Sequence, residues 1–274
     1  MTTVLVFAAL SLFGVFPLLY FSLRLSLWLC ILLTLLSFPF LQFLYVLFFR
    51  IVAGTVPDDR PIEKQNRICR FGTVTMISAL DVYAGVRPVI TGVEKLPKEG
   101  RFLYVCNHRS MFDPVIVMDR LHKYNISFIS KPSNMKIPLI GRVAYAVGFL
   151  AIDRENDRNA LKTILTAADY MKRDVCSMGV YPEGTRSKTK ELLPFHAGCF
   201  KAAQRAKVPI VVACVHGSEK VKLLNPFSTA TVYLDILEMI PAETVCNMRT
   251  DALSEHIRSV IQEDLDRTET EARS

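Results

Sequence analysis

The chain has 274 residues, 51% of them hydrophobic, and a formal net charge of +7. This length suits one domain with a sizeable core, and the positive charge favours a membrane surface or an anionic substrate as partner. Nucleic acid is the competing explanation for basic charge, but we expect no nucleic-acid binding because the sequence carries no nucleic-acid-binding motif.

The first 49 residues are almost entirely apolar and contain a single charged side chain, Arg24. Residues 25–49 would form a helix about 37 Å long, enough to cross a hydrocarbon core of about 30 Å, and residues 2–23 are a second candidate. A cleaved signal peptide is not expected, because no positive residue precedes the apolar run. Two spans, a re-entrant helical hairpin, or one span with an interfacial helix would each make residues 1–52 a membrane-anchoring segment.

Basic residues follow this apolar segment closely. They are Arg50, Arg60, Lys64, Arg67 and Arg70. Positive charge beside an apolar segment favours the cytoplasmic side and attracts anionic lipid headgroups. The sequence therefore predicts a membrane protein, integral or monotopic, in which the domain after the anchoring segment faces the cytoplasm.

Residues 53–266 alternate short apolar runs with helical periodicity, which is typical of an α/β domain with a single sheet flanked by helices. The expected strands are residues 102–106, 126–130, 147–152, 177–181, 210–215 and 231–237. The expected helices are residues 161–171 with Asn159 as their cap, 198–206 and 251–266. We expect the polar tail, residues 267–274, to be frayed.

The seven cysteines show no C-x-x-C spacing. Cys106, Cys176 and Cys214 lie in or beside strand-like apolar runs, where cysteine usually serves as a small buried hydrophobic residue. We therefore expect a reducing compartment and no metal site.

The string N-H-R-S-M-F-D, residues 107–113, places a histidine and a carboxylate five positions apart at the end of an expected strand. Ser110 would cap the next helix, and this geometry would let the Asp113 carboxylate turn back toward the His108 ring. Such a pair can act as a general base on a substrate hydroxyl, as in the serine-protease triad without its serine. The competing interpretation is a satisfied histidine and an aspartate that only caps the helix.

A second string, E-G-T-R-S at residues 183–187, follows another expected strand. Gly184 can bring backbone N–H groups close to an anion, and Arg186 can grip a phosphate with two parallel hydrogen bonds. The competing interpretation is a surface turn with a solvated arginine. Both strings behind one membrane anchor together favour a general base that works on a phosphate-bearing alcohol.

Four blocks between about Arg87 and Val221 resemble those of the lysophospholipid acyltransferases, specifically the 1-acylglycerol-3-phosphate acyltransferases. The blocks are N-H-x-x-x-x-D at Asn107, His108 and Asp113; a lysine and then G-x-x-x-I-D-R at Lys131 and Gly148–Arg154; E-G-T-R-S at Glu183–Ser187; and V-P-I-V at Val208–Val211. Two departures stand out. Ser133 and Asn134 replace a frequent glutamate and leucine, and Val212 replaces the second proline of the fourth block.

The resemblance implies that His108, oriented by Asp113, deprotonates the free hydroxyl of a lysophosphatidic acid. The oxygen would then attack the thioester of acyl-CoA or an acyl-carrier protein, forming phosphatidic acid in a membrane. The residues implied to hold the acceptor phosphate are Glu183, Gly184, Thr185, Arg186, Arg154 and Lys131, with Asn107, Ser110 and Pro209 as supporting residues. No metal or bound cofactor is implied. The sequence leaves open an acyltransferase for another lysophospholipid or an amino-acid lipid, and a non-catalytic lipid-binding membrane protein.

Overall fold

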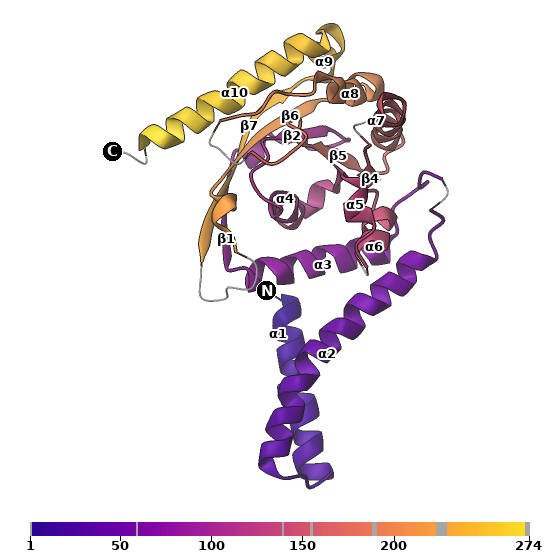
Figure 1. Cartoon of the computed structure of the whole chain (residues 1–274), viewed down its shortest axis with the longest axis vertical. Coiled ribbons are helices and arrows are strands. Elements are labelled where there is room, and N and C mark those ends of the chain that lie inside the picture. The colour runs from indigo at the N-terminus through magenta and orange to yellow at the C-terminus, as the bar shows by residue number, and fades with distance from the viewer. Residues whose placement is uncertain are drawn as a thin grey trace.

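The computed structural model describes residues 2–58, 60–138, 140–153, 156–187, 191–222 and 229–271. A helical hairpin at the N-terminus projects from an α/β domain, and the C-terminal helix lies on the side of the domain away from the hairpin (Figure 1).

The centre of the domain is one mixed sheet of seven strands in the order β1-β7-β6-β2-β5-β3-β4. The strands are β1 (Val86–Thr91), β2 (Leu103–Cys106), β3 (Ile126–Ser130), β4 (Leu150–Ala151), β5 (Ser177–Val180), β6 (Ile210–His216) and β7 (Ala230–Ile240). Neighbouring strands are parallel except β6 and β7, which are antiparallel. The predicted single sheet flanked by helices is confirmed.

The two ends of the sheet differ from the prediction. β1 was not predicted; it is an edge strand, which explains why it tolerates Pro88. The strand predicted over residues 147–152 shrinks to Leu150–Ala151. The reason is that a helix ends at Ala146. Gly148, whose φ is +93°, then turns the chain before the strand begins.

Helices cover both faces of the sheet (Figure 1). One face packs against α7 (Asp157–Lys172), α8 (Lys201–Ala206) and α10 (Thr250–Glu271), and the other against α3 (Arg67–Tyr83) and α4 (Asp113–Arg120). The shorter helices are η3 (Val93–Lys95), η4 (His122–Tyr124), α5 (Pro132–Met135), α6 (Gly141–Ala146), η5 (Ala197–Phe200), η6 (Ser218–Lys220) and α9 (Ala242–Asn247). Alternate residues of β2 serve the two cores, because successive side chains of a strand point to opposite faces.

Two helix predictions were wrong at their ends. The cap of α7 is Asn156, whose side chain accepts the Asn159 N–H at 3.1 Å, so Asn159 lies inside the first turn. The tail predicted to be frayed from residue 267 is helical as far as Glu271, and Arg267 pairs with Asp264 inside α10. Residues 272–274 of that tail lie outside the described residues.

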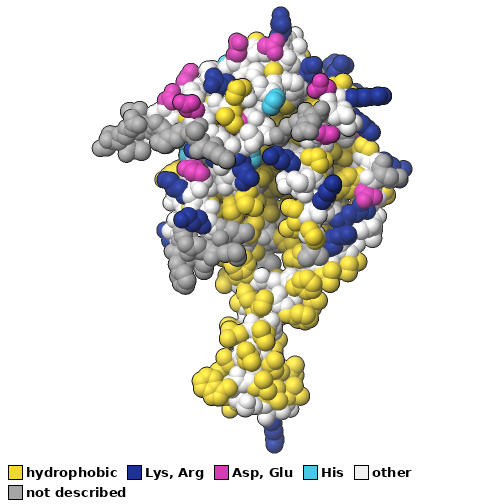
Figure 2. Space-filling view, in the orientation of Figure 1, with side chains coloured by type: hydrophobic (Ala, Val, Ile, Leu, Met, Phe, Trp, Pro, Cys, Tyr) yellow, Lys and Arg dark blue, Asp and Glu magenta, His cyan; other side chains and the backbone are white. Residues whose placement is uncertain are grey.

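The N-terminal segment forms an antiparallel hairpin. Its first arm comprises α1 (Thr2–Ala9) and two π-helical segments, η1 (Leu10–Val15) and η2 (Leu18–Ser22), and its second arm is α2 (Leu27–Gly54). Both arms are long and apolar enough to cross a membrane, and Figure 2 shows apolar side chains over the hairpin surface. The hairpin docks on α3, where Phe49 packs so closely over Gly72 that an added Cβ would lie 2.4 Å from the ring.

Candidate active site

Three strands deliver the predicted site residues to one edge of the sheet. β2, β5 and β3 are parallel neighbours, so their carboxyl ends lie side by side, which is the usual place for ligands in α/β sheets. Asn107 and His108 follow β2, Glu183 follows β5, and Lys131 follows β3. The two strings meet there, because the Ser187 N–H donates to the His108 carbonyl oxygen at 2.9 Å.

His108 and Asp113 form the hydrogen-bonded pair that the first string predicted. His108 Nδ1 lies 2.8 Å from Asp113 Oδ2, and the same oxygen accepts the backbone N–H groups of Arg109 and Ser110 at 2.7 and 2.8 Å. The Asp113 side chain is 1% exposed and that of His108 is 18% exposed. A carboxylate acceptor keeps the proton on Nδ1, so Nε2 carries the lone pair that can accept a proton from a substrate.

The loop before α4 creates this geometry. The helix begins at Asp113, and Pro114 follows in its first turn, where the missing N–H leaves no hydrogen bond unmade. Ser110 does not cap the helix as predicted: its Oγ accepts the Phe112 N–H at 3.3 Å, and Phe112 occupies the position before the helix. The Asp113 carboxylate does turn back onto the Ser110 N–H, which is the other half of a capping pattern.

Asn107 continues the sheet pairing past the end of β2. Its Nδ2 donates to the Val215 carbonyl oxygen at 3.0 Å, and its Oδ1 accepts the Val215 N–H at 2.8 Å. The side-chain amide therefore replaces a peptide group, so the chain can leave the sheet while β6 stays fully bonded. These two hydrogen bonds fix the position of Asn107, the residue immediately before His108.

Glu183 lies buried beneath the His108 loop. Its Oε1 accepts the His108 N–H at 2.7 Å, and its Oε2 accepts the Leu193 N–H at 3.0 Å. Burial raises the pKa of the Glu183 carboxyl, and the two backbone hydrogen bonds oppose that rise. The resemblance implied a phosphate contact, whereas the structure gives both carboxylate oxygens to the main chain. The next residue, Gly184, has φ of +72° and makes the turn that brings Glu183 under the loop.

Tyr181 belongs to the site, although the sequence patterns identified it only as a strand residue. Its ring stacks on the His108 ring, with centroids 4.2 Å apart and an interplanar angle of 17°, and also on Phe128 at 5.4 Å and 7°. Among the described residues, the Tyr181 and Tyr104 hydroxyls and Asp113 Oδ1 are buried without a hydrogen-bond partner. Burial, and then the charge of Asp113, raise the pKa of the Tyr181 phenol well above its usual range. The sole sequence signal was an aromatic residue between a strand and a glycine turn.

The remaining predicted residues are not all at this edge. Thr185, Arg186 and Lys131 have exposed side chains in the loops that follow β5 and β3. Pro209 lies at the opposite edge, because it precedes β6, and its carbonyl oxygen accepts the Leu103 N–H at 3.0 Å. Pro209 therefore supports the pairing of β2 with β6 at the edge of the sheet opposite His108. Arg154 lies outside the described residues.

A pocket of about 560 Å³ adjoins the site. It lies between the ends of β3 and β5, helix α7 and the 3₁₀ turn η5, and Tyr181 and Gly184 border it on the His108 side. The lining is mostly apolar, with Asp157, His196 and Lys201 as its polar residues. A concave apolar pocket with a few polar groups is typical of a small-molecule site.

Comparison with known proteins identifies the family. Residues 87–216 match a family model described as Acyltransferase. The chain is 32% identical over 167 residues to the 1-acyl-sn-glycerol-3-phosphate acyltransferase of Salmonella typhimurium, over 60% of this chain and 66% of the relative. It is 30% identical over 189 residues to acl-1 of Caenorhabditis elegans, a relative named provisionally for the same activity, over 69% of this chain and 71% of the relative. The chain belongs to the 1-acyl-sn-glycerol-3-phosphate acyltransferase family.

A solved structure shares the fold of this acyltransferase-family chain. The crystal structure of the 1-acyl-sn-glycerophosphate (LPA) acyltransferase PlsC from Thermotoga maritima superposes with a TM-score of 0.64 at 19% identity, covering 84% of this chain and 92% of that chain. The match to the Salmonella relative spans 66% of its length, just under two thirds. The family-model match, residues 87–216, includes both strings of the site.

Proposed function

We propose that this chain transfers an acyl group from acyl-CoA or an acyl-carrier protein to the free hydroxyl of 1-acyl-sn-glycerol-3-phosphate, forming phosphatidic acid. The observation that carries the proposal is the His108–Asp113 pair beside a mostly apolar pocket. Relatives from Salmonella and Escherichia coli are named for this reaction. A lipid-binding protein without catalysis has no use for a histidine held with its Nε2 lone pair available.

The proposed reaction needs one base that later acts as an acid. His108 Nε2 takes the proton of the acceptor hydroxyl while the hydroxyl oxygen attacks the thioester carbonyl carbon. A carbon–oxygen bond forms, the carbon–sulfur bond breaks, and the imidazolium returns the proton to the departing thiolate. The Asp113 carboxylate stabilises the imidazolium between these two steps, and the backbone N–H groups of Arg109 and Ser110 hold it for that role.

The acceptor phosphate is proposed to bind between His108 and the loops that follow β5 and β3. Arg186 and Lys131 are exposed basic residues in loops that follow adjacent strands, so their charges suit a phosphate dianion at this edge. Thr185 offers a hydroxyl next to Arg186. Glu183 and Gly184 shape the loop that carries these groups. Arg154, carried over from the family pattern, is proposed as a further phosphate contact.

The apolar pocket is proposed to hold the acyl chain that is transferred. Its lining includes Ile129, Ile152 and Leu161, and each methylene group removed from water contributes about 0.8 kcal/mol. Tyr181 forms part of the wall and also stacks on His108, so a chain seated there places its thioester end near the base. Lys201 supplies a positive charge for the anionic donor.

The hairpin is proposed to anchor the domain to a membrane, with the domain in the cytoplasm. The start of α1 and the end of α2 both lie beside the domain, and Arg24 lies in the turn between the arms (Figure 1). This arrangement favours two spans or a re-entrant hairpin over one span with an interfacial helix. Arg50, Arg60 and Arg67 follow or end the second arm, which is the cytoplasmic pattern. A fluorescent protein fused after Ser274 should fluoresce, and a fused periplasmic phosphatase should stay inactive; the reverse pattern refutes this orientation.

The test of the reaction uses the purified full-length chain in mixed micelles with 1-acyl-glycerol-3-phosphate and a panel of acyl-CoA donors. Thiol release and phosphatidic acid formation are followed together for the wild type and for His108→Ala. His256→Ala is the matched control, because His256 is a half-exposed histidine on α10 that pairs with Glu238.

Phosphatidic acid made by the wild type and by His256→Ala, but not by His108→Ala, supports both the reaction and the base. Turnover only with another lysolipid would show that the acceptor is that lysolipid and would leave the proposed mechanism unchanged. Turnover that survives in His108→Ala would refute the role of His108. Lysolipid binding without turnover by any thioester, carrier-protein donors included, would favour a lipid-binding protein.

A further inference from the structure

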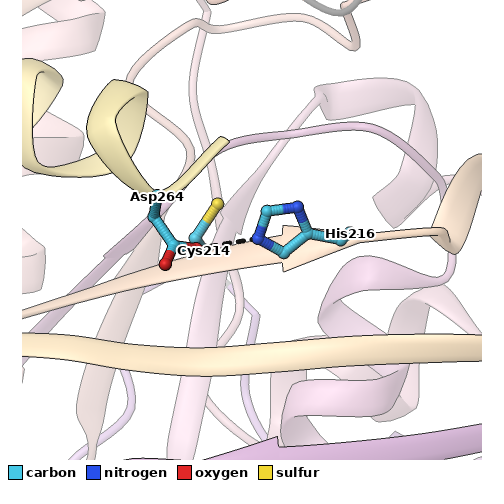
Figure 3. A group of neighbouring side chains, drawn as sticks. All are labelled: Cys214, His216 and Asp264. Carbon is cyan, nitrogen blue, oxygen red and sulfur yellow. Dashed lines mark hydrogen bonds and ion pairs between the residues drawn. The ribbon is translucent and has the colours of Figure 1, made fainter. Parts of the chain in front are cut away.

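A cluster of three metal-ligating side chains lies on the face of the sheet that α10 covers. Cys214 and His216 belong to β6, and Asp264 belongs to α10. One potential ligand atom from each residue lies within 4.8 Å of the others, and the three side chains converge in Figure 3. Cys214 and Asp264 are buried, and His216 is partly exposed. The acyl transfer described above uses none of these residues.

The architecture of the sheet explains why the side chains converge. Cys214 and His216 are two positions apart in a strand, so they share a face. Asp235 of β7 is the direct partner of Cys214 in the antiparallel ladder, and its Oδ2 lies 3.7 Å from His216 Nε2. Asp264 Oδ2 lies 2.8 Å from the same nitrogen. A sulfur, a nitrogen and two carboxylates from three separate elements therefore gather at one place.

We propose that Cys214, His216 and Asp264 bind a zinc-class divalent cation, with Asp235 as the fourth ligand. Sulfur, imidazole and carboxylate together are a donor set that tetrahedral zinc accepts. Tetrahedral zinc bonds of about 2.1 Å would set the Nε2 to Oδ2 distance at about 3.4 Å, so the pair, now 2.8 Å apart, needs to open by only about 0.6 Å. Rotation of the two side chains supplies a movement of this size.

The charges around the cluster suit a divalent cation. With the cation bound, a Cys214 thiolate and the Asp235 and Asp264 carboxylates would carry three negative charges. The cation and the Arg267 guanidinium, which pairs with Asp264 Oδ1, balance them. Arg267 leaves Oδ2 of Asp264 for the cation and holds the carboxylate in orientation, as outer groups do at metal sites. The bound cation would tie α10 to the sheet.

This site escaped the sequence analysis for a physical reason. The expectation of no metal site rested on the absence of C-x-x-C pairs, whereas this ligand set combines C-x-H on one strand with a carboxylate from a distant helix. The alternative explanation is an ion pair between His216 and Asp264 that fastens α10 without a cation. The two explanations differ in one respect: an ion pair does not need the thiol of Cys214.

The test titrates metal-free full-length protein in detergent with Co²⁺ and with Zn²⁺. Co²⁺ bound by Cys214 should produce thiolate-to-cobalt charge-transfer absorption that saturates at one equivalent. At 100 times its dissociation constant, Zn²⁺ should raise the Tm by about 5–10 °C. Cys214→Ser should abolish both effects, and Cys246→Ser, which alters an exposed cysteine on α9, should preserve both.

The wild-type measurements test the proposed metal site even where a variant folds poorly. The absence of charge-transfer absorption and of a Zn²⁺-dependent Tm shift in the wild-type protein would overturn the site and leave the ion pair. Effects that persist at full size in folded Cys214→Ser would also overturn it, because the cation would then bind elsewhere. Neither readout involves acyl transfer, so the outcome is independent of the proposed reaction.

Discussion

Asp113→Asn separates two contributions of the Asp113 carboxylate, which are to fix the tautomer of His108 and to supply negative charge. Oδ2 accepts two backbone N–H groups as well as His108 Nδ1. An asparagine that turned its NH₂ group toward these donors would lose all three hydrogen bonds. It therefore presents its carbonyl oxygen to them, so the His108 tautomer is kept and the charge alone is lost.

The cost of losing the charge can be bounded from this geometry. Replacing a charge-assisted hydrogen bond by a neutral one removes about 1.5 kcal/mol of stabilisation from the imidazolium. The Coulomb attraction of charge centres about 4 Å apart sets an upper limit of about 4 kcal/mol at an effective dielectric constant of about 20. Because each 1.4 kcal/mol is tenfold in rate, we expect kcat to fall by about 10- to 1,000-fold. An inverted tautomer would cost more, about 10⁴-fold, as in a serine protease.

The measurement is kcat for acyl transfer in mixed micelles, with wild type, Asp113→Asn and His108→Ala compared over a range of pH. Asp169→Asn is the control, since it removes a half-exposed carboxylate that pairs with Arg173 on α7. A fall of 10⁴ or more, or down to the His108→Ala level, would show that the backbone N–H groups do not hold the asparagine. An unchanged kcat would show that the pair does not act in catalysis.

Three further changes probe residues around His108 and one buried carboxyl elsewhere in the domain. Tyr181→Phe keeps the ring stack and removes a buried hydroxyl without a partner, so we expect kcat within about threefold of wild type, whereas Tyr181→Ala should lower it more than tenfold; equal effects in kinetic assays would refute the stacking role. Glu183→Gln turns an NH₂ group toward a backbone N–H and should lower the Tm by about 3–8 °C together with kcat, while exposed Glu191→Gln should not. Burial, and then the charge of Asp119, raise the pKa of Asp81 to about 7, so the folded state binds its proton more tightly than the unfolded state and stability falls as pH rises from about 4 to 7. Asp81→Asn should therefore raise the Tm at pH 8 and have little effect at pH 4; a rise that is equal at both pH values in thermal melts would contradict this.

The parts of the site that the sequence could predict are those encoded by neighbours in the chain. Buried strands are short apolar runs, and His108 and Asp113 lie five positions apart around the loop that leads into α4, so their pairing follows from local geometry. Pro209 was predicted as a supporting residue, and the sequence did not say at which edge of the sheet it lies. Its block precedes β6, whereas His108 follows β2, and because these two strands are parallel the two positions lie at opposite edges.

Contacts between distant segments could not be predicted in this way. Tyr181 reaches His108 only because β5 and β2 are adjacent and parallel, and that order is a property of the folded sheet. Glu183 has its main-chain role for the same reason. The sequence showed an acid in a glycine turn, and the resemblance implied that this acid holds the acceptor phosphate; its hydrogen bonds to the His108 and Leu193 N–H groups appear only in the folded loop.

Main-chain groups hold much of the loop that carries His108 and Asp113. Asn107 is fixed by the Val215 peptide, the His108 N–H by Glu183, and the Asp113 carboxylate by two loop N–H groups. All of these hydrogen bonds are made by groups of the chain itself, so the binding of a substrate need not supply the order that fixes the His108 ring.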